Sequence, residues 1–196
     1  MPNIYFTSDL HLDHGNIIKY CKRPFTDAKS MTEEIILKWN NQVQINDLVF
    51  ILGDFLWGKN IDRLTEITNR LNGRKILIKG NHDYFDNDDY INAGFEKVLS
   101  LAEFEYQNQL FVLCHYQMMH WNCSHHGAIH LYGHQHDKKQ YIPNHIAHQQ
   151  LGMSERKMNV CMDSNNFQLF SINEIIEKLK DRPTNWWREN ETNEKI

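Results

Sequence analysis

The sequence predicts a single-domain protein of the α/β (α+β) class, built on layered β-sheet. Short aliphatic and aromatic runs, which suit buried strands, alternate with stretches whose apolar residues have helical spacing. Polar residues that bind divalent cations follow nearly every apolar run. The chain of 196 residues is long enough for a substantial core and contains no internal repeat or linker. We therefore expect one domain at residues 1–183 and a tail at 184–196 that is polar apart from Trp186 and Trp187.

Five apolar runs are predicted to be buried strands. In layered α/β sheets, active sites gather beyond the carboxyl ends of the strands. Polar residues that are distant in the sequence are therefore expected to meet at one edge of the sheet. The five runs are Ile4–Thr7, Leu48–Leu52, Lys75–Ile78, Leu110–Leu113 and Ile129–Tyr132.

Capping signals predict three helices. The first begins at the capping box Ser30-Met31-Thr32-Glu33 and ends near Gln42. The second runs from Ile61 to Leu71 with Asn60 as its N-cap, and the third begins at the capping box Ser171-Ile172-Asn173-Glu174 and ends near Lys180. The stretch from Asp137 to Lys157 lacks periodicity and is predicted to be a long surface excursion.

The composition limits the partners of the protein. A net charge of -4 argues against stable binding to nucleic acid by bulk positive charge, although a nucleic acid could be a transient substrate. The four cysteines form no CxxC pair, so we expect reduced thiols in a cytoplasmic protein. The sequence shows neither a signal peptide nor an apolar run long enough to span a membrane, so no membrane partner is expected.

Two acidic clusters follow the first two predicted strands. Asp9 and His11 stand two residues apart at a strand end, where side chains at i and i+2 project to the same side and can meet one ion. Asp54 follows Gly53, which allows a tight turn, and its two carboxylate oxygens could bridge two cations. Taken alone, each pattern is more often an ordinary loop or turn.

Three further clusters contain histidine. In Gly80-Asn81-His82-Asp83, Asn81 offers a neutral oxygen ligand, and His82 can face a substrate as an acid or an electrostatic clamp; a simple turn is the alternative. His115 follows the fourth strand, and His134 and His136 follow the fifth, where both bind one ion or each binds a different one. For the remaining histidines of this region we favour surface or core roles: His120, His125, His126, His130, His145 and His148.

In this order, the motifs resemble those of the calcineurin-like metallophosphoesterase superfamily. The match is to its small bacterial and phage members, which carry Thr7-Ser8-Asp9-Leu10-His11, Arg23-Pro24-Phe25 and Gly53-Asp54-Phe55. The resemblance implies a four-layer αββα sandwich with two metal ions. It implies that Asp9, His11 and His136 bind one ion, that Asn81, His115 and His134 bind the other, and that Asp54 bridges them. It also implies in-line attack on phosphorus by a metal-bridging hydroxide, with His82 protonating the leaving oxygen or stabilising the charge on the phosphoryl group.

The ligand chemistry limits the choice of metal, and one departure from the family pattern limits the choice of substrate. Nitrogen and oxygen ligands without thiolate suit Mn, the leading candidate, or Fe or Zn, rather than Ca. Phe55-Leu56-Trp57 stands where protein phosphatases of the family carry an Asp-Arg-Gly, so protein phosphatase activity is disfavoured. The leading expectation is hydrolysis of a phosphodiester in a small nucleotide or cyclic nucleotide. A DNA or RNA nuclease, a phosphomonoesterase and a non-catalytic binding module are the alternatives.

Three residues shortly after the first ligand pair are candidates for substrate binding. His14, Asn16 and Arg23 could reach a phosphate, and the guanidinium of Arg23 could bind it through two hydrogen bonds. A solvated loop is the alternative interpretation of this stretch.

Overall fold

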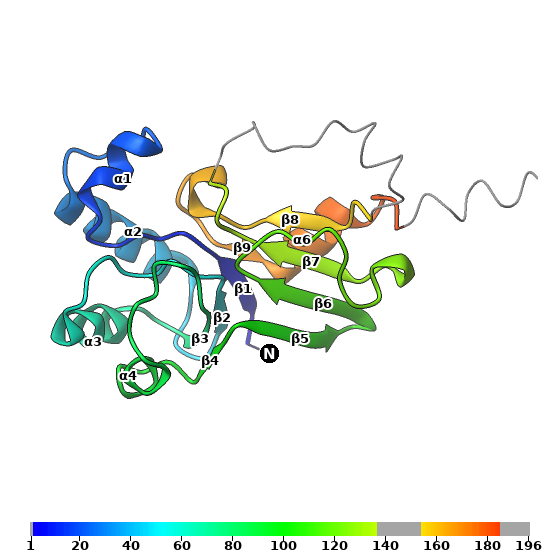
Figure 1. Ribbon diagram of the computed structural model, residues 1–196, viewed down its shortest axis with the longest axis horizontal. Coiled ribbons are helices and arrows are strands. Elements are labelled where there is room, and N and C mark those ends of the chain that lie inside the picture. The colour runs from blue at the N-terminus through cyan, green and yellow to red at the C-terminus, as the bar shows by residue number, and fades with distance from the viewer. Residues whose placement is uncertain (1, 137–153, 185–196) are drawn as a thin grey trace, which may run out of the picture.

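Two β-sheets pack face to face and are flanked by helices in a single domain, as Figure 1 shows. The structure is a computed structural model that describes residues 2–136 and 154–184. The fold class expected from the sequence is confirmed. Most of the surface excursion predicted at 137–157, and the predicted tail after Thr184 with Trp186 and Trp187, lie outside the described residues.

The first sheet has five strands in the order β4-β3-β2-β1-β9. Strands β1 (Ile4–Thr7), β2 (Leu48–Ile51) and β3 (Arg74–Ile78) are parallel and match the first three predicted strands closely. Strand β4 (Lys97–Leu99) continues the parallel order, and β9 (Phe170–Ser171) pairs antiparallel with β1. The sequence did not indicate β4 and β9, because three and two residues are too few to display a period.

The second sheet has four strands in the order β5-β6-β7-β8. Strands β6 (Gln109–Cys114) and β7 (Ile129–Tyr132) confirm the last two predicted strands and run parallel to each other and to β8 (Lys157–Asn159). Strand β5 (Leu101–Tyr106) forms an antiparallel hairpin with β6. Its side chains alternate between exposed and half-buried along its length, so it carries no apolar run that the sequence could reveal.

The helices follow the predictions with one correction. Helices α3 (Ile61–Arg70) and α6 (Ile172–Leu179) begin after the predicted caps Asn60 and Ser171. Helix α2 (Ala28–Gln42) ends as predicted but begins about one turn early, because the carboxylate of Asp27 accepts the N–H of Ser30 at 2.8 Å. The predicted cap Ser30 is therefore the third residue of this helix. The short helices α1 (Gly15–Tyr20) and α4 (Asn87–Asn92) were not predicted.

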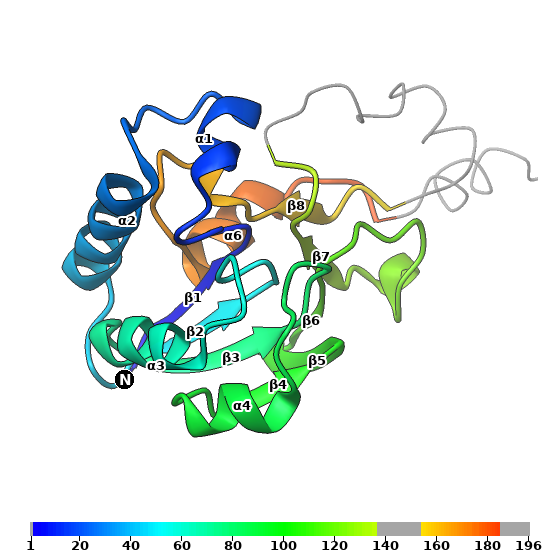
Figure 2. The ribbon, with the colours of Figure 1, turned by 60° about the vertical axis from the view of Figure 1, so that its left-hand side comes forward.

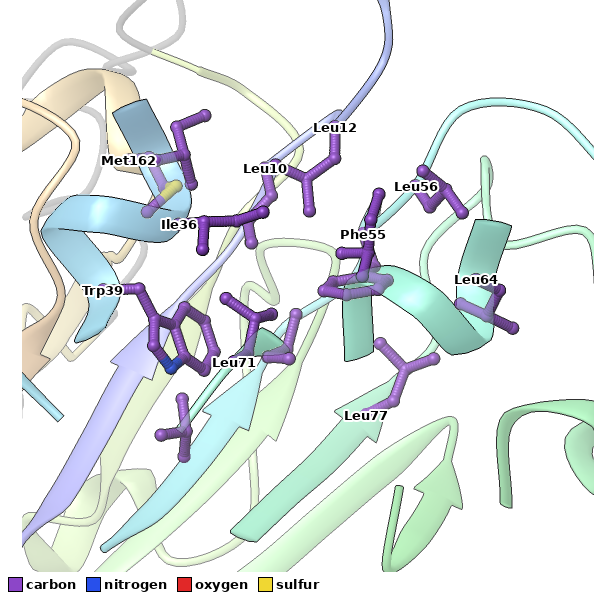
Figure 3. Packing of buried hydrophobic residues seen from close by; sticks show 14 of the residues in the cluster. Leu10, Leu12, Ile36, Trp39, Phe55, Leu56, Leu64, Leu71, Leu77 and Met162 are labelled. Carbon is purple, nitrogen blue, oxygen red and sulfur yellow. The ribbon is translucent and has the colours of Figure 1, made fainter. Parts of the chain in front are cut away.

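Alternate residues of the first sheet supply two cores. Val49, Ile51 and Leu77 face α2 and α3, which cover one side of the sheet (Figure 2). Figure 3 shows this core, where Trp39 of α2 and Leu64 of α3 pack with apolar residues of the sheet and of the loops that follow it. Burial of each such side chain contributes about 1.5–3 kcal/mol. The helical period in α2 and α3 therefore fixes which faces they turn toward the sheet.

An aromatic cluster joins the two sheets. Phe6 and Phe50 of the first sheet stack at 5.4 Å between ring centroids, and Phe104 and Phe111 of the second sheet stack at 5.2 Å. The pairs meet across the interface, with Phe50 and Phe104 at 5.0 Å. Face-to-face packing of the sheets brings the carboxyl ends of β1, β2 and β3 to the same region as those of β6, β7 and β8.

The outer face of the second sheet is covered by the loop from Tyr116 to Ala128, in which Trp121 packs against Val112. The indole N–H of Trp121 donates to the carbonyl of Ala128 at 2.9 Å. None of the helices formed by residues 2–136 and 154–184 has the length and apolar character needed to cross a membrane.

Candidate metal centre

The loops after β1 and β2 run side by side and turn at their polar residues. The N–H of Asp9 donates to the carbonyl of Gly53 at 3.0 Å, and that of His11 donates to the carbonyl of Asp54 at 2.9 Å. Asp9, His11 and Asp54 have φ values of 55°, 47° and 57°, in the left-handed region that non-glycine residues seldom adopt. The extended i, i+2 geometry expected for Asp9 and His11 is therefore wrong, although both side chains point to one place.

Two groups of ligand atoms share one carboxylate. Asp9, His11 and Asp54 offer atoms that all lie within 4.8 Å of one another, and so do Asp54, His115 and His134. The Oδ2 atom of Asp54 lies 3.4 Å from Nε2 of His11 and 3.6 Å from Nε2 of His115. A carboxylate that belongs to both groups is placed to bridge two cations. Asp9, His11, Asp54 and His115 are buried, with at most 2% of their surface exposed.

The environment of His115 fits a metal ligand. Its Nδ1 atom lies 2.7 Å from the carbonyl oxygen of Leu52, which accepts only if Nδ1 carries the proton. In neutral imidazole this leaves a lone pair on Nε2, which faces Oδ1 of Asn81 at 3.1 Å and the carboxylate of Asp54. Three electron-pair donors that converge in this way repel one another unless a cation lies among them. The donor set therefore fits a divalent ion.

His136 is held by a carboxylate that the sequence analysis missed. Its Nδ1 lies 2.7 Å from Oδ2 of Asp163, and its Nε2 lies 3.8 Å from Oδ1 of Asp9. Asp163 follows β8 and so stands at the same sheet edge as the other polar residues. The strand-then-carboxylate pattern was present in the sequence, but three residues of β8 were too few to mark it. A carboxylate behind a histidine commonly orients that histidine toward a metal.

The guanidinium of Arg23 is buried and has its partners inside the protein. Its Nε and Nη2 atoms donate to the two carboxylate oxygens of Asp163, each at 2.8 Å. Its Nη1 and Nη2 also donate to the carbonyls of Leu10 and Asp9, at 2.8 and 2.7 Å. The guanidinium is buried and engaged inside the protein, which contradicts the predicted substrate contact. Arg23 instead fixes Asp163 and the loop that carries Asp9.

The glycines of the motifs permit close approach of the loops. A Cβ on Gly133 would collide with Ser8 and with the carboxylate of Asp9, which accepts the backbone N–H of His134 at 3.0 Å. A Cβ on Gly80 would collide with Asp54. Glycine at these positions therefore lets the loops of the two sheets meet around the ligand atoms.

His82 and Asp83 diverge, and each has a partner. Nδ1 of His82 lies 2.7 Å from the phenol oxygen of Tyr84. Asp83 is buried, and its carboxylate accepts the N–H groups of Asp54, Phe55 and Gly80 at 2.8–3.0 Å. Asp83 thus ties together the loops after β2 and β3. Tyr84, which no sequence pattern marked, is the hydrogen-bond partner of His82.

Burial dominates the electrostatics of the centre. It raises the pKa of Asp54 to about 6 and lowers the pKa of His11 to about 2. Burial also acts to raise the pKa of Asp163, but hydrogen bonds from His136 and Arg23 outweigh it and hold that pKa well below its usual range. Burial thus disfavours the charged forms of Asp54 and His11, whereas Asp163 stays charged.

Four of the seven candidate ligands, His11, Asp54, His134 and His136, line a pocket of about 310 Å³. His14 and Asn16, two of the three predicted substrate residues, line it. His14 is buried, with its ring stacked on that of Trp57, and Asn16 is exposed. The full lining consists of His11, His14, Asn16, Ile17, Tyr20, Asp54, Trp57, His82, His134 and His136.

Comparisons with known proteins show the family to which this chain belongs. An uncharacterized protein of Methanocaldococcus jannaschii is 33% identical over 182 residues, which cover 92% of this chain and 93% of that protein. A solved structure of a protein of unknown function from Aquifex aeolicus has the same fold, with a TM-score of 0.71 at 22% identity over 91% of this chain and 100% of its own. The family model described as calcineurin-like phosphoesterase matches residues 2–194. The chain thus belongs to the calcineurin-like phosphoesterases, a family of metal-dependent hydrolases that act on phosphate esters.

Proposed function

We propose that this protein is a dinuclear phosphodiesterase that acts on a nucleotide or cyclic nucleotide. The observation that supports this best is the position of Asp54, whose carboxylate belongs to two groups of ligand atoms at once. A carboxylate shared in this way is typical of sites that hold a pair of divalent ions for phosphoryl chemistry.

The seven candidate ligands divide between the two positions. In this proposal, Asp9, His11 and His136 hold one ion, Asn81, His115 and His134 hold the other, and Asp54 contacts both. Mixed imidazole and oxygen donors favour Mn, with Fe or Zn as alternatives. When bound, such ions supply Lewis acidity and lower the pKa of a bound water.

His82 is the proposed general acid. It lines the pocket beside Asp54, and its backbone N–H donates to Oδ1 of Asp54 at 2.9 Å. The phenol of Tyr84 can donate to Nδ1 of His82, which favours the tautomer with the proton on Nε2. In this proposal that proton passes to the leaving oxygen.

The pocket supports a small substrate rather than a long strand of nucleic acid. A volume of about 310 Å³ lies at the lower end of the range for small-molecule sites. The net charge of -4 gives little general attraction for a polyanion.

A hydrolysis panel tests the proposal. Protein treated with chelator and then supplied with Mn is assayed on bis-p-nitrophenyl phosphate, p-nitrophenyl phosphate, cyclic nucleotides and single-stranded DNA. We expect metal-dependent turnover that favours the small diesters. Preference for the monoester or for DNA would instead indicate a phosphomonoesterase or a nuclease, and no turnover on any ester would refute the proposal.

Two variants separate metal binding from proton transfer. Asp54→Asn is expected to lose tight binding of both metals together with activity, since an uncharged amide with one oxygen cannot bridge two cations. His82→Ala is expected to keep the metals and mainly lower kcat, by about 100-fold or more. Wild-type turnover in His82→Ala would remove this residue from the mechanism.

A further inference from the structure

The pocket beside the candidate metal centre has two unlike halves. One half carries the proposed metal ligands and His82. The other half is formed by helix α1, which is dark blue in Figure 2, by the residue before it and by Trp57. The residues of this second half are His14, Asn16, Ile17, Tyr20 and Trp57. The proposed chemistry uses none of them.

Trp57 forms a fixed aromatic wall in this half. Its ring stacks on that of His14, with 3.8 Å between centroids and an angle of 3° between planes. Its backbone N–H donates to the carbonyl of Leu12 at 2.9 Å, which anchors it to the loop after β1. Despite these contacts, 39% of Trp57 remains exposed. A ring that is already immobilised loses little conformational entropy when a ligand covers it.

The ring of His14 packs against one face of Trp57. Only 7% of its surface is exposed, and its Nδ1 atom is buried without a hydrogen-bond partner. Tyr20 adds a second aromatic ring at the rim and is 67% exposed. These two partly exposed rings give the pocket an aromatic surface suited to a flat apolar group.

The charges of the lining residues limit which chemical group can bind in this half of the pocket. None of the described residues that line the pocket is a lysine or an arginine, so this half is unsuited to a second phosphate. Asn16 offers an amide that can both donate and accept a hydrogen bond. A flat, uncharged group with donors and acceptors on its edge matches these features.

Resting on the proposed function, we infer that this half of the pocket binds the nucleobase of the substrate. The base stacks on the exposed surface of Trp57, and the amide of Asn16 hydrogen-bonds to the edge of the base. The phosphate then lies toward Asp54 and His82. Stacking on an aromatic side chain tolerates any base, so this subsite selects nucleotides as a class rather than one base.

Equilibrium binding tests this inference separately from catalysis. Adenosine 5′-monophosphate and ribose 5-phosphate share the phosphate and the sugar and differ only by the base. Isothermal titration of the Mn-supplied protein measures the dissociation constant of each, under conditions where no inorganic phosphate is released. We expect the nucleotide to bind at least about fivefold more tightly, as one stacked base provides.

Variants of Trp57 show whether the ring causes the difference. Trp57→Leu keeps an apolar side chain but removes the aromatic face, and is expected to reduce the preference to less than about twofold. Trp57→Phe should restore most of it. Ile61→Ala is the matched control, because Ile61 is 41% exposed and lies outside the pocket.

The outcomes distinguish this inference from the proposed function. Equal affinity for the two ligands in the wild type, or an unchanged preference in a folded Trp57→Leu protein, would overturn the nucleobase subsite even if phosphodiesters are hydrolysed. If Trp57→Leu does not fold, the wild-type comparison still decides. A Trp57-dependent preference without hydrolysis of any ester would support the subsite and overturn the proposed reaction.

Discussion

Asp163→Asn tests whether the carboxylate behind His136 controls metal binding. Asp163 receives hydrogen bonds from Nδ1 of His136 at 2.7 Å and from two nitrogens of Arg23 at 2.8 Å each. Asparagine preserves the shape but replaces one oxygen by an NH₂ group. That group would face a donor from His136 or from Arg23. The substitution therefore removes one acceptor and the negative charge without creating a large cavity.

Two effects of different size are expected. Loss of a carboxylate that orients a metal-binding histidine weakens metal affinity by 10- to 100-fold, or about 1.4–2.8 kcal/mol. Breaking a buried ion pair costs about 3–5 kcal/mol of folding stability. Because Arg23 keeps its contacts with the carbonyls of Asp9 and Leu10, we expect the stability loss at the lower end, about 3 kcal/mol.

Calorimetric Mn titration of the chelated protein measures affinity, and urea unfolding measures stability. Glu33→Gln is the matched control, because Glu33 also pairs with an arginine, Arg70, through two hydrogen bonds, but on the surface. It should cost less than about 1 kcal/mol and leave metal affinity unchanged. If folded Asp163→Asn binds metal as tightly as the wild type, Asp163 does not position His136.

Three further predictions concern other contacts. Tyr84→Phe removes the partner of His82, so kcat should fall about tenfold for esters with poor leaving groups and little for p-nitrophenyl esters, which need less proton transfer. Burial lowers the pKa of His130 to about 4. His130 therefore stays neutral in the folded protein at pH values where the unfolded chain, with a histidine pKa near 6.5, binds a proton. Because protonation favours the unfolded state, this residue lowers the free energy of unfolding by about 2 kcal/mol between pH 7 and pH 5. Gly133→Ala forces a Cβ onto Ser8 and Asp9 and should cost about 1–3 kcal/mol in urea unfolding and weaken Mn binding in calorimetry.

Each of these three predictions has a control or an outcome that would contradict it. For Tyr84→Phe, equal losses for good and poor leaving groups would argue against orientation of His82. For the pH dependence, His130→Gln should lack that part of the stability loss in urea unfolding at the two pH values. If wild type and variant lose the same stability, His130 does not titrate as described. Gly15→Ala, whose new Cβ would make only ordinary contact with Ala28, is the control for Gly133→Ala; equal stabilities would contradict the argument from close approach.

The sequence predicted those helices and strands in which the apolar pattern extends over enough residues to be recognised. The five longer apolar runs are strands, and α3 and α6 start at the predicted caps because a short polar side chain satisfies free N–H groups there. The start of α2 was misplaced because Asp27 and Ser30 both offer capping oxygens, and only the structure shows that Asp27 is used.

The location of the candidate site could be predicted in part, for a different reason. Its candidate ligands follow strands, so their grouping could be expected from topology alone. The roles of Arg23, Asp163 and Tyr84 depend on which partner each side chain meets across the fold. Arg23 and Asp163 are 140 residues apart. No local pattern encodes such a pair.

The left-handed residues of the candidate centre have a consequence for how the protein is held together. Asp9, His11, Asp54, His134 and His136 all have positive φ, and each such conformation costs on the order of 1 kcal/mol. Glycine would relieve this cost but would remove the ligand. At these five positions, the need for a side chain that can bind a cation thus conflicts with the preference of the backbone for glycine. We therefore expect bound cations to rigidify the loops at this sheet edge, and hydrogen exchange to accelerate there first when a chelator removes the cations.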